Sequence, residues 1–186
     1  MARPLRIEYE GAWYHVMNRG AARQAVFASD AHRDRFLQLL ADLLDRFGVE
    51  THAYCLMGNH YHLLLHTPLG NLGRSMRHLN GVYTQFFNRD QRRDGALFRG
   101  RYKAILVDAD AYLLHLSSYI HRNPLEAGMV ERLRDYPWSS YPAYAGHAKP
   151  PGWLRRDRVY SMLGGKAKRY QSFVGNGVDE DLAKFY

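Results

Sequence analysis

Residues 57–66 read Met57-Gly58-Asn59-His60-Tyr61-His62-Leu63-Leu64-Leu65-His66, and the predicted fold is built outward from them. The flanks predict two strands, one over 49–57 and one from His60 to the residue before Pro68, joined by a turn at Gly58-Asn59. Side chains alternate faces along a strand, so His60 and His62 share a face with their Cα atoms roughly 7 Å apart. Both imidazoles can therefore meet one metal ion.

A His-X-His triplet in a strand has a simpler interpretation, as a surface pair or a hydrogen-bonded core feature. The chain contains ten histidines, which makes such a coincidence easier. A metal site also needs at least one further ligand. The best source for it is the stretch Ser118-Tyr119-Ile120-His121-Arg122-Asn123-Pro124.

Composition limits the class of protein. A chain of 186 residues can form one sizeable core. Its 26 Lys and Arg against 18 Asp and Glu give a net charge of +8. Such a charge attracts polyanions, nucleic acid above all, although a soluble protein can also be basic without binding one. Cys55 is the only cysteine, and neither a membrane-spanning apolar run nor a signal core is present. We expect a cytoplasmic, nucleoid-associated protein.

Hydrophobic periodicity predicts the remaining elements. Strands are expected over 12–17 and 97–107, and amphipathic helices over 30–47, 71–89 and from Asp108 or Asp110 to Asn123. Ser29 or Asp30 caps the first helix and Gly48 ends it. The order strand, helix, strand, strand, helix, strand, helix predicts an α+β fold. This fold is a ferredoxin-like split βαβ antiparallel sheet with an added helix.

The added helix carries Tyr119 and Asn123. Residues four positions apart share one helical face, so the phenol and the amide are expected side by side. Pro124 disfavours helical geometry in the preceding residue, which places Asn123 at the end of the helix.

Cations alternate with aromatic and apolar residues over Phe98-Arg99-Gly100-Arg101-Tyr102-Lys103-Ala104. A strand here would carry Arg99, Arg101 and Lys103 on one face. Such charges either protect an edge strand from aggregation or contact phosphates, and we favour phosphate contact. Arg74 and Arg77, on the outer face of the second helix, are further candidates for DNA binding.

Composition changes near residue 130, so we divide the chain into a catalytic domain over 1–130 and a basic, aromatic extension over 131–186. From Glu131 to Tyr170 there are nine Lys or Arg and three Asp or Glu. Rings can stack on bases while cations such as Arg155 and Arg156 follow phosphates. The same segment could instead pack over the edge of the domain, and the two roles are compatible.

Several stretches together resemble a known family. They are Tyr14-His15-Val16-Met17-Asn18-Arg19-Gly20, Phe36-Leu37-Gln38-Leu39-Leu40, Cys55 through Leu64, Leu97 through Lys103, Tyr119 through Val130, and Tyr136-Pro137-Trp138-Ser139-Ser140-Tyr141. In this order they resemble the single-tyrosine HUH transposases of the insertion-sequence-200 type, especially the REP-associated tyrosine transposases. One departure is Gly58, where relatives usually have proline, and a turn accepts either residue.

The resemblance implies a metal-dependent endonuclease and strand transferase that acts in DNA transposition and recombination on single-stranded DNA, folded as a hairpin. Tyr119 would be the nucleophile that forms a 5′-phosphotyrosine, and His60, His62 and Asn123 would hold Mg²⁺ or Mn²⁺. Phosphoryl transfer requires an ion that accepts oxygen ligands, which favours the same two metals. No general base is assigned, and His121 points to another side of the helix from Tyr119. Relatives include monomers and homodimers.

Two other functions share some of these sequence features. A DNA-binding protein of the same fold that has lost cleavage would retain the basic surface, but here the tyrosine and both histidines are present. A metal-dependent hydrolase of small molecules is excluded by size, because the barrels that carry such histidine pairs need about 250 residues.

Overall fold

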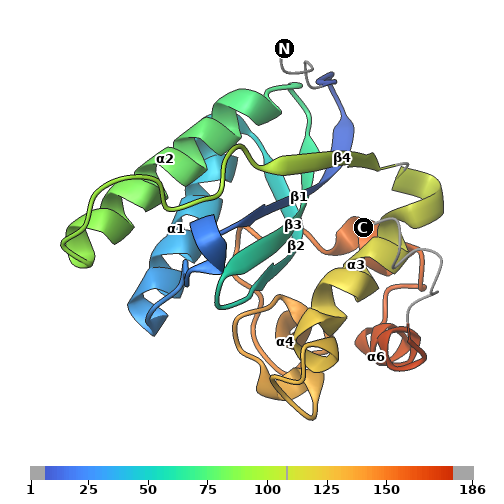
Figure 1. Cartoon of the computed structure of the whole chain (residues 1–186). Coiled ribbons are helices and arrows are strands. Elements are labelled where there is room, and N and C mark those ends of the chain that lie inside the picture. Colours follow the sequence, from blue (N-terminus) through green and yellow to red (C-terminus); the bar gives the residue numbers. More distant parts are fainter. Residues whose placement is uncertain (1–6, 108, 178–186) are drawn as a thin grey trace.

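The computed structural model describes residues 7–107 and 109–177, without the side chains of residues 109–111. Its secondary structure, shown in Figure 1, is β1 (Ala12–Arg19), η1 (Ala21–Arg23), α1 (Asp30–Phe47), β2 (Glu50–Leu56), β3 (His60–Thr67), α2 (Leu72–Asp90), β4 (Lys103–Val107), α3 (Ala109–Glu126), η2 (Leu133–Asp135), α4 (Tyr141–Tyr144), α5 (Asp157–Ser161) and α6 (Ala167–Gly175). Asp108, one of the two expected openings of the third helix, lies outside the described residues.

One four-stranded sheet organises the molecule. Its strand order is β2-β3-β1-β4, and all three neighbouring pairs are antiparallel. Helices α1 and α2 lie on one face, whereas α3 lies on the other together with the C-terminal helices (Figure 1). The predicted ferredoxin-like split βαβ sheet with an added helix is confirmed.

The register of β1 against β3 decides which side chains share a face. Arg19 pairs with His60, Met17 with His62, and Trp13 with His66. Directly opposite residues of antiparallel strands project to the same side, so one face of the sheet carries all six side chains. Alternation sends Tyr61 to the opposite face, where its hydroxyl donates to Asn80 Oδ1 of α2 (2.8 Å).

Helix α1 begins and ends as its sequence predicts. The Ser29 side chain accepts a hydrogen bond from the backbone N–H of His32 and so caps the first turn. Gly48 has φ 64° and its N–H bonds the carbonyls of Leu43 and Leu44. This left-handed cap is one that glycine adopts without a Cβ clash.

The prediction of a strand over 97–107 is wrong for its first half, because β4 begins only at Lys103. The ladder between β1 and β4 stops at the Met17–Lys103 pair. Before that point Gly100 lies in a loop, and the Gly100 carbonyl accepts a hydrogen bond from Asn18 Nδ2 (3.4 Å). Arg99 and Arg101 are therefore loop residues, and only Lys103 of the three cations lies in a strand.

The expected end of the third helix at Asn123 is also wrong, since α3 continues through Pro124 to Glu126. Proline lacks an N–H, so it forfeits one hydrogen bond here. The last turn is closed by the N–H of Ala127, which donates to the Asn123 carbonyl (2.9 Å), and by Gly128 at φ 66°. Asn123 still follows Tyr119 by one helical turn.

The described part of the C-terminal extension packs along β2, an edge strand of the sheet. Tyr136 Oη donates to the Leu56 carbonyl (2.7 Å), Tyr144 Oη to the His52 carbonyl (2.7 Å), and the Arg155 N–H to the Thr51 carbonyl (3.0 Å). These contacts cover a strand edge that would otherwise expose unpaired backbone groups. Within the described ranges we find no helix with the length and hydropathy needed to cross a bilayer.

Candidate active site

The two histidines of the triplet lie at the start of β3, beside α3. His60 is half-buried and His62 is buried, and their ring centroids are 5.1 Å apart. Burial lowers the pKa of His60 to about 4, with Arg19 contributing, and lowers the pKa of His62 well below its ordinary value. Both rings are therefore neutral at pH 7, which is the state in which imidazole binds metal.

Neighbouring side chains orient these rings. His60 Nδ1 donates to Asn59 Oδ1 (2.6 Å), which leaves Nε2 as the donor atom for an ion. His62 Nδ1 lies 2.9 Å from His15 Nε2, on the adjacent strand. With the proton on His62 Nδ1, the lone pair of its Nε2 is likewise available to bind an ion. Partners of this kind fix the tautomer of metal-binding histidines, so the pair fits a divalent ion.

Helix α3 brings Tyr119 to the same place. Its ring centroid lies 5.8 Å from that of His62 and 5.9 Å from that of His15, edge-on to both. Burial raises the pKa of Tyr119, and so does Glu126, whereas Asn123 and Arg19 lower it. The phenol is protonated at neutral pH and must lose its proton to act as a nucleophile.

Asn123 lies with the tyrosine. Its Nδ2 donates to the Tyr119 backbone carbonyl (2.8 Å), and its side chain lowers the pKa of the Tyr119 phenol. The shared helical face is thus observed, while coordination of an ion together with His60 and His62 stays a prediction.

A pocket of about 520 Å³ opens in front of the histidine pair. It is lined by Met17, Asn18, Arg19, His60, His62, Arg99, Gly100, Arg101 and Lys103. The three cations expected on one strand face thus gather here even though two of them lie in a loop. The pocket combines two neutral ligands with four exposed positive charges, an arrangement suited to phosphate.

Sequence reasoning missed Arg19 and His15. Both are on β1, at alternate positions, and both face the histidine pair. The signal was present as the run Trp13, His15, Met17, Arg19 with a period of two. It becomes meaningful only once β1 is known to be the neighbour of β3.

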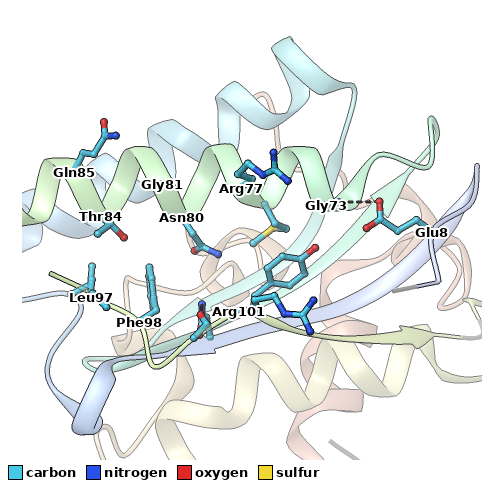
Figure 2. Close-up of a pocket in the computed structure, with 15 residues that line it drawn as sticks. Glu8, Gly73, Arg77, Asn80, Gly81, Thr84, Gln85, Leu97, Phe98 and Arg101 are labelled. Atoms are coloured by element: carbon cyan, nitrogen blue, oxygen red, sulfur yellow. Dashed lines mark hydrogen bonds between the residues drawn. The ribbon is translucent and has the colours of Figure 1, made fainter. Parts of the chain in front are cut away.

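A second pocket, of about 890 Å³, borders the first. Asn18, Gly100 and Arg101 line both pockets. Figure 2 shows Arg77, Asn80, Thr84 and Gln85 of α2 on one side and Leu97, Phe98 and Arg101 on the other. Arg77, a predicted DNA contact, therefore lines the second pocket, which shares Arg101 with the histidine pocket.

The other predicted DNA-binding cations are placed elsewhere. The guanidinium of Arg74 lies 5.6 Å from the Phe47 ring centroid. Arg156 Nη1 donates to the Ala143 carbonyl (2.6 Å) and to Tyr160 Oη (3.1 Å), so this side chain makes internal contacts. Arg155 is exposed, and its backbone N–H is bound to β2.

His121 is directed away from the pocket. It is fully buried, with Nδ1 2.6 Å from Tyr170 Oη and Nε2 2.6 Å from Ser140 Oγ. Burial lowers its pKa to about 3. These contacts give it a structural role and agree with the expectation that it is not the general base.

Among the described residues, a different group of metal-ligating side chains, Glu50, His52 and His66, places one possible donor atom from each within 4.8 Å of the others. This group lies at the other end of β2 and β3 from the His60 and His62 pair. The two arrangements are therefore separate places on the sheet.

Comparison with known families assigns the class. The family model described as IS200-like transposase matches residues 8–123, a region that includes both histidines, Tyr119 and Asn123. The chain belongs to the IS200-like transposase family, which confirms the resemblance seen in its motifs.

Individual relatives narrow the comparison. A Haemophilus influenzae protein named as a REP-associated tyrosine transposase is 28% identical over 109 residues, covering 52% of this chain and 61% of that protein. The chain therefore spans about 61% of the length of this curated relative. A solved structure described as a REP-associated tyrosine transposase bound to a REP hairpin aligns with a TM-score of 0.64 at 16% identity, over 85% of this chain and 93% of the other. At 16% identity, this solved structure shows a similarity of fold alone.

Proposed function

We propose that this transposase is an HUH-type, metal-dependent endonuclease and strand transferase that acts on hairpin-containing single-stranded DNA through a 5′-phosphotyrosine intermediate. The observation that carries the proposal is the meeting of Tyr119 with His62 within one chain, at 5.8 Å between ring centroids. The nucleophile and the paired imidazoles come from different elements, and they converge beside a cationic pocket.

The chain's own cations would bind the reacting phosphodiester. A phosphodiester repels nucleophiles because it is negatively charged, so the reaction needs charge neutralisation and positioning. Arg19, Arg99, Arg101 and Lys103 supply that charge around His60 and His62. A phosphate held in this pocket would lie beside the phenol of Tyr119.

In the proposed reaction the Tyr119 oxygen attacks phosphorus and the bond from phosphorus to the 3′ oxygen breaks. The products are a 5′-phosphotyrosine and a free 3′-hydroxyl. The proton that the phenol gives up is balanced by the proton that the 3′ oxygen takes up. Because Tyr119 is protonated at neutral pH, its proton leaves during the attack.

His60 and His62, together with Asn123, would hold Mg²⁺ or Mn²⁺, which supplies Lewis-acid stabilisation of the phosphoryl oxygens when bound. Three neutral ligands leave such an ion its full positive charge. The contribution of His15 and Asn59 is to keep the imidazole tautomers in the ligand form.

Two neighbouring pockets bear on the substrate. Arg101 lines both, so a strand held at the histidines would pass Arg101 to reach Arg77 of α2. The solved relative is described as bound to a REP hairpin, which supports a hairpin for this chain too. Arg74, Arg155 and Arg156 lie outside both pockets and are proposed as further DNA contacts, for which Arg156 would have to exchange its bonds to Ala143 and Tyr160. A nucleoid location would follow from them.

A cleavage assay tests the proposal. An end-labelled single strand that carries a hairpin is incubated with the protein and Mn²⁺, and the products are separated on a denaturing gel. Wild-type protein should cut the strand, whereas Tyr119→Phe should bind it with unchanged affinity and leave it intact. Tyr112→Phe, on the same helix, is the matched control and should cut normally. A strand that is bound but never cut by the wild type would identify a DNA-binding protein without catalysis.

A further inference from the structure

The start of β2 and the end of β3 carry a second cluster of metal-ligating side chains. Glu50 pairs in register with His66, and a β-bulge between Thr51 and Ala53 accommodates His52 as the extra residue. Glu50 Oε2 lies 2.8 Å from His66 Nδ1 and 3.4 Å from His52 Nε2. One donor atom from each residue lies within 4.8 Å of the other two.

This cluster is separate from the candidate active site. His66 and His62 are four residues apart on β3, which corresponds to about 13 Å along a strand. Leu64, which is fully buried, lies between them on the same face. None of the three residues lines the pocket at His60 and His62.

An aromatic wall shields the cluster on one side. The Trp13 ring is stacked on His66 at 4.5 Å between centroids and tilted against His52 at 4.4 Å. The His52 side chain is 5% exposed, whereas those of His66 and Glu50 are 21% and 31% exposed. His52 is thus buried, whereas His66 and Glu50 are accessible to an ion and a water molecule from solvent.

We propose that Glu50, His52 and His66 form a second metal site that binds a transition-metal ion of the zinc class, with water in the fourth position. Two imidazoles and one carboxylate are a common zinc donor set. Around a tetrahedral zinc ion such donors lie about 3.3 Å apart, so the present separations require only small side-chain movements.

The donor atoms of this cluster favour a different metal from the one proposed beside Tyr119. Imidazole favours zinc over magnesium, which prefers oxygen ligands in octahedral geometry. The ring nitrogens of His52 and His66 that now donate to Glu50 Oε2 would give up their protons to an ion bound here.

The place of the cluster in the fold indicates a structural role. Tyr144 Oη donates to the His52 carbonyl, and the Arg155 N–H donates to the Thr51 carbonyl. An ion bound here would join the beginning of β2 to the end of β3 where the C-terminal segment is attached. Zinc should accordingly raise the midpoint of thermal unfolding.

Zinc binding to the full chain tests the site, measured by competition with a chromogenic chelator. Co²⁺ is used in parallel, because its visible absorption reports tetrahedral coordination. The double variant His60→Ala/His62→Ala, which removes the other histidine pair, should still bind one zinc ion. Glu50→Gln and His66→Gln in that background should each weaken binding at least about tenfold. Circular dichroism checks that each variant is folded.

Three results would overturn the site. The first is a His60→Ala/His62→Ala variant that binds no zinc, and the second is a Glu50→Gln variant that binds it as tightly as its parent. The third is a Co²⁺ spectrum without tetrahedral bands, in which case the three residues form only a hydrogen-bonded cluster. None of these outcomes depends on DNA cleavage, so each is distinct from failure of the proposed activity.

Discussion

At the scale of single residues, the chemistry of the site follows from two short spacings. The period of two in a strand puts His60 and His62 on one face, and the period of 3.6 in a helix puts Asn123 beside Tyr119. Both are local rules, so both can be read from the sequence. His15 and Arg19 could not be predicted in the same way, because their place in the site depends on the register of β1 against β3.

His15 is expected to act by positioning His62. In His15→Ala the His62 ring loses its 2.9 Å contact and its fixed tautomer. We expect Mn²⁺ affinity to fall about 10- to 100-fold, as for other residues that orient a metal ligand. The measurement is the Mn²⁺ concentration that gives half-maximal cleavage. His15→Gln, which can still hydrogen bond, should recover part of the loss, and His147→Ala is the exposed control.

The cations of the pocket are expected to contact phosphates. Removing one phosphate contact on a single strand lowers the slope of log affinity against log salt by about 0.7. Arg101→Ala should therefore weaken DNA binding and flatten the salt dependence by about that amount, measured by fluorescence anisotropy. Arg46→Ala, an exposed cation of α1 that lines neither pocket, should leave the slope unchanged. An unchanged slope in Arg101→Ala would exclude this contact.

At the scale of elements, the position of α3 is set by the C-terminal extension. His121 bonds Ser140 and Tyr170, and Ser140 Oγ in turn accepts from the Tyr54 N–H of β2 (2.9 Å). The helix that carries Tyr119 is thus fixed to the sheet of its own chain. These partners lie far from His121 in the sequence, so no local pattern could have predicted them.

Loss of this anchor should destabilise the protein. In His121→Ala, Ser140 and Tyr170 each lose one buried hydrogen bond but keep another, to Tyr54 and Ser117 respectively, and the missing ring leaves a buried cavity. We expect the free energy of unfolding in urea to fall by at least about 2 kcal/mol. His147→Ala on the exposed surface should change it by less than about 0.5 kcal/mol. Equal stability of the two variants would show that the anchor does not hold α3.

At the scale of the whole molecule, the sequence predicted the sheet topology and the basic character of one surface. It left two roles open for the extension, and its described residues pack on β2. Composition could not decide this, since aromatic rings stack on bases and on a protein edge alike. The sequence left monomer and homodimer open, and the contact between Tyr119 and His62 forms within one chain.

Buried neutral histidines should make the fold sensitive to acid. Burial lowers the pKa of His15 and His121 to about 3 and of His52 to about 4, and it lowers the pKa of His62 well below its ordinary value. An unfolded histidine titrates near pH 6.5, so below that pH the unfolded chain binds protons that the folded chain does not. Stability is full above about pH 6.5 and falls as the pH drops toward about 4.

The expected loss is about 1.4 kcal/mol per pH unit for each of these histidines. Together they could remove most of a typical free energy of unfolding, about 5–15 kcal/mol, by about pH 5. Urea unfolding at pH 8, 7, 6 and 5 in the presence of EDTA measures this directly. A stability that is constant from pH 7 to pH 5 would show that these rings are protonated in the folded protein.

The proposed cleavage chemistry depends most on which residue is the nucleophile. The direct measurement is to trap the protein on a hairpin single strand with Mn²⁺, digest the covalent adduct, and map the modified residue by mass spectrometry. We predict one nucleotide-bearing peptide, with the phosphate on Tyr119. Cleavage without an adduct, or an adduct on any other of the 14 tyrosines, would contradict the proposed chemistry.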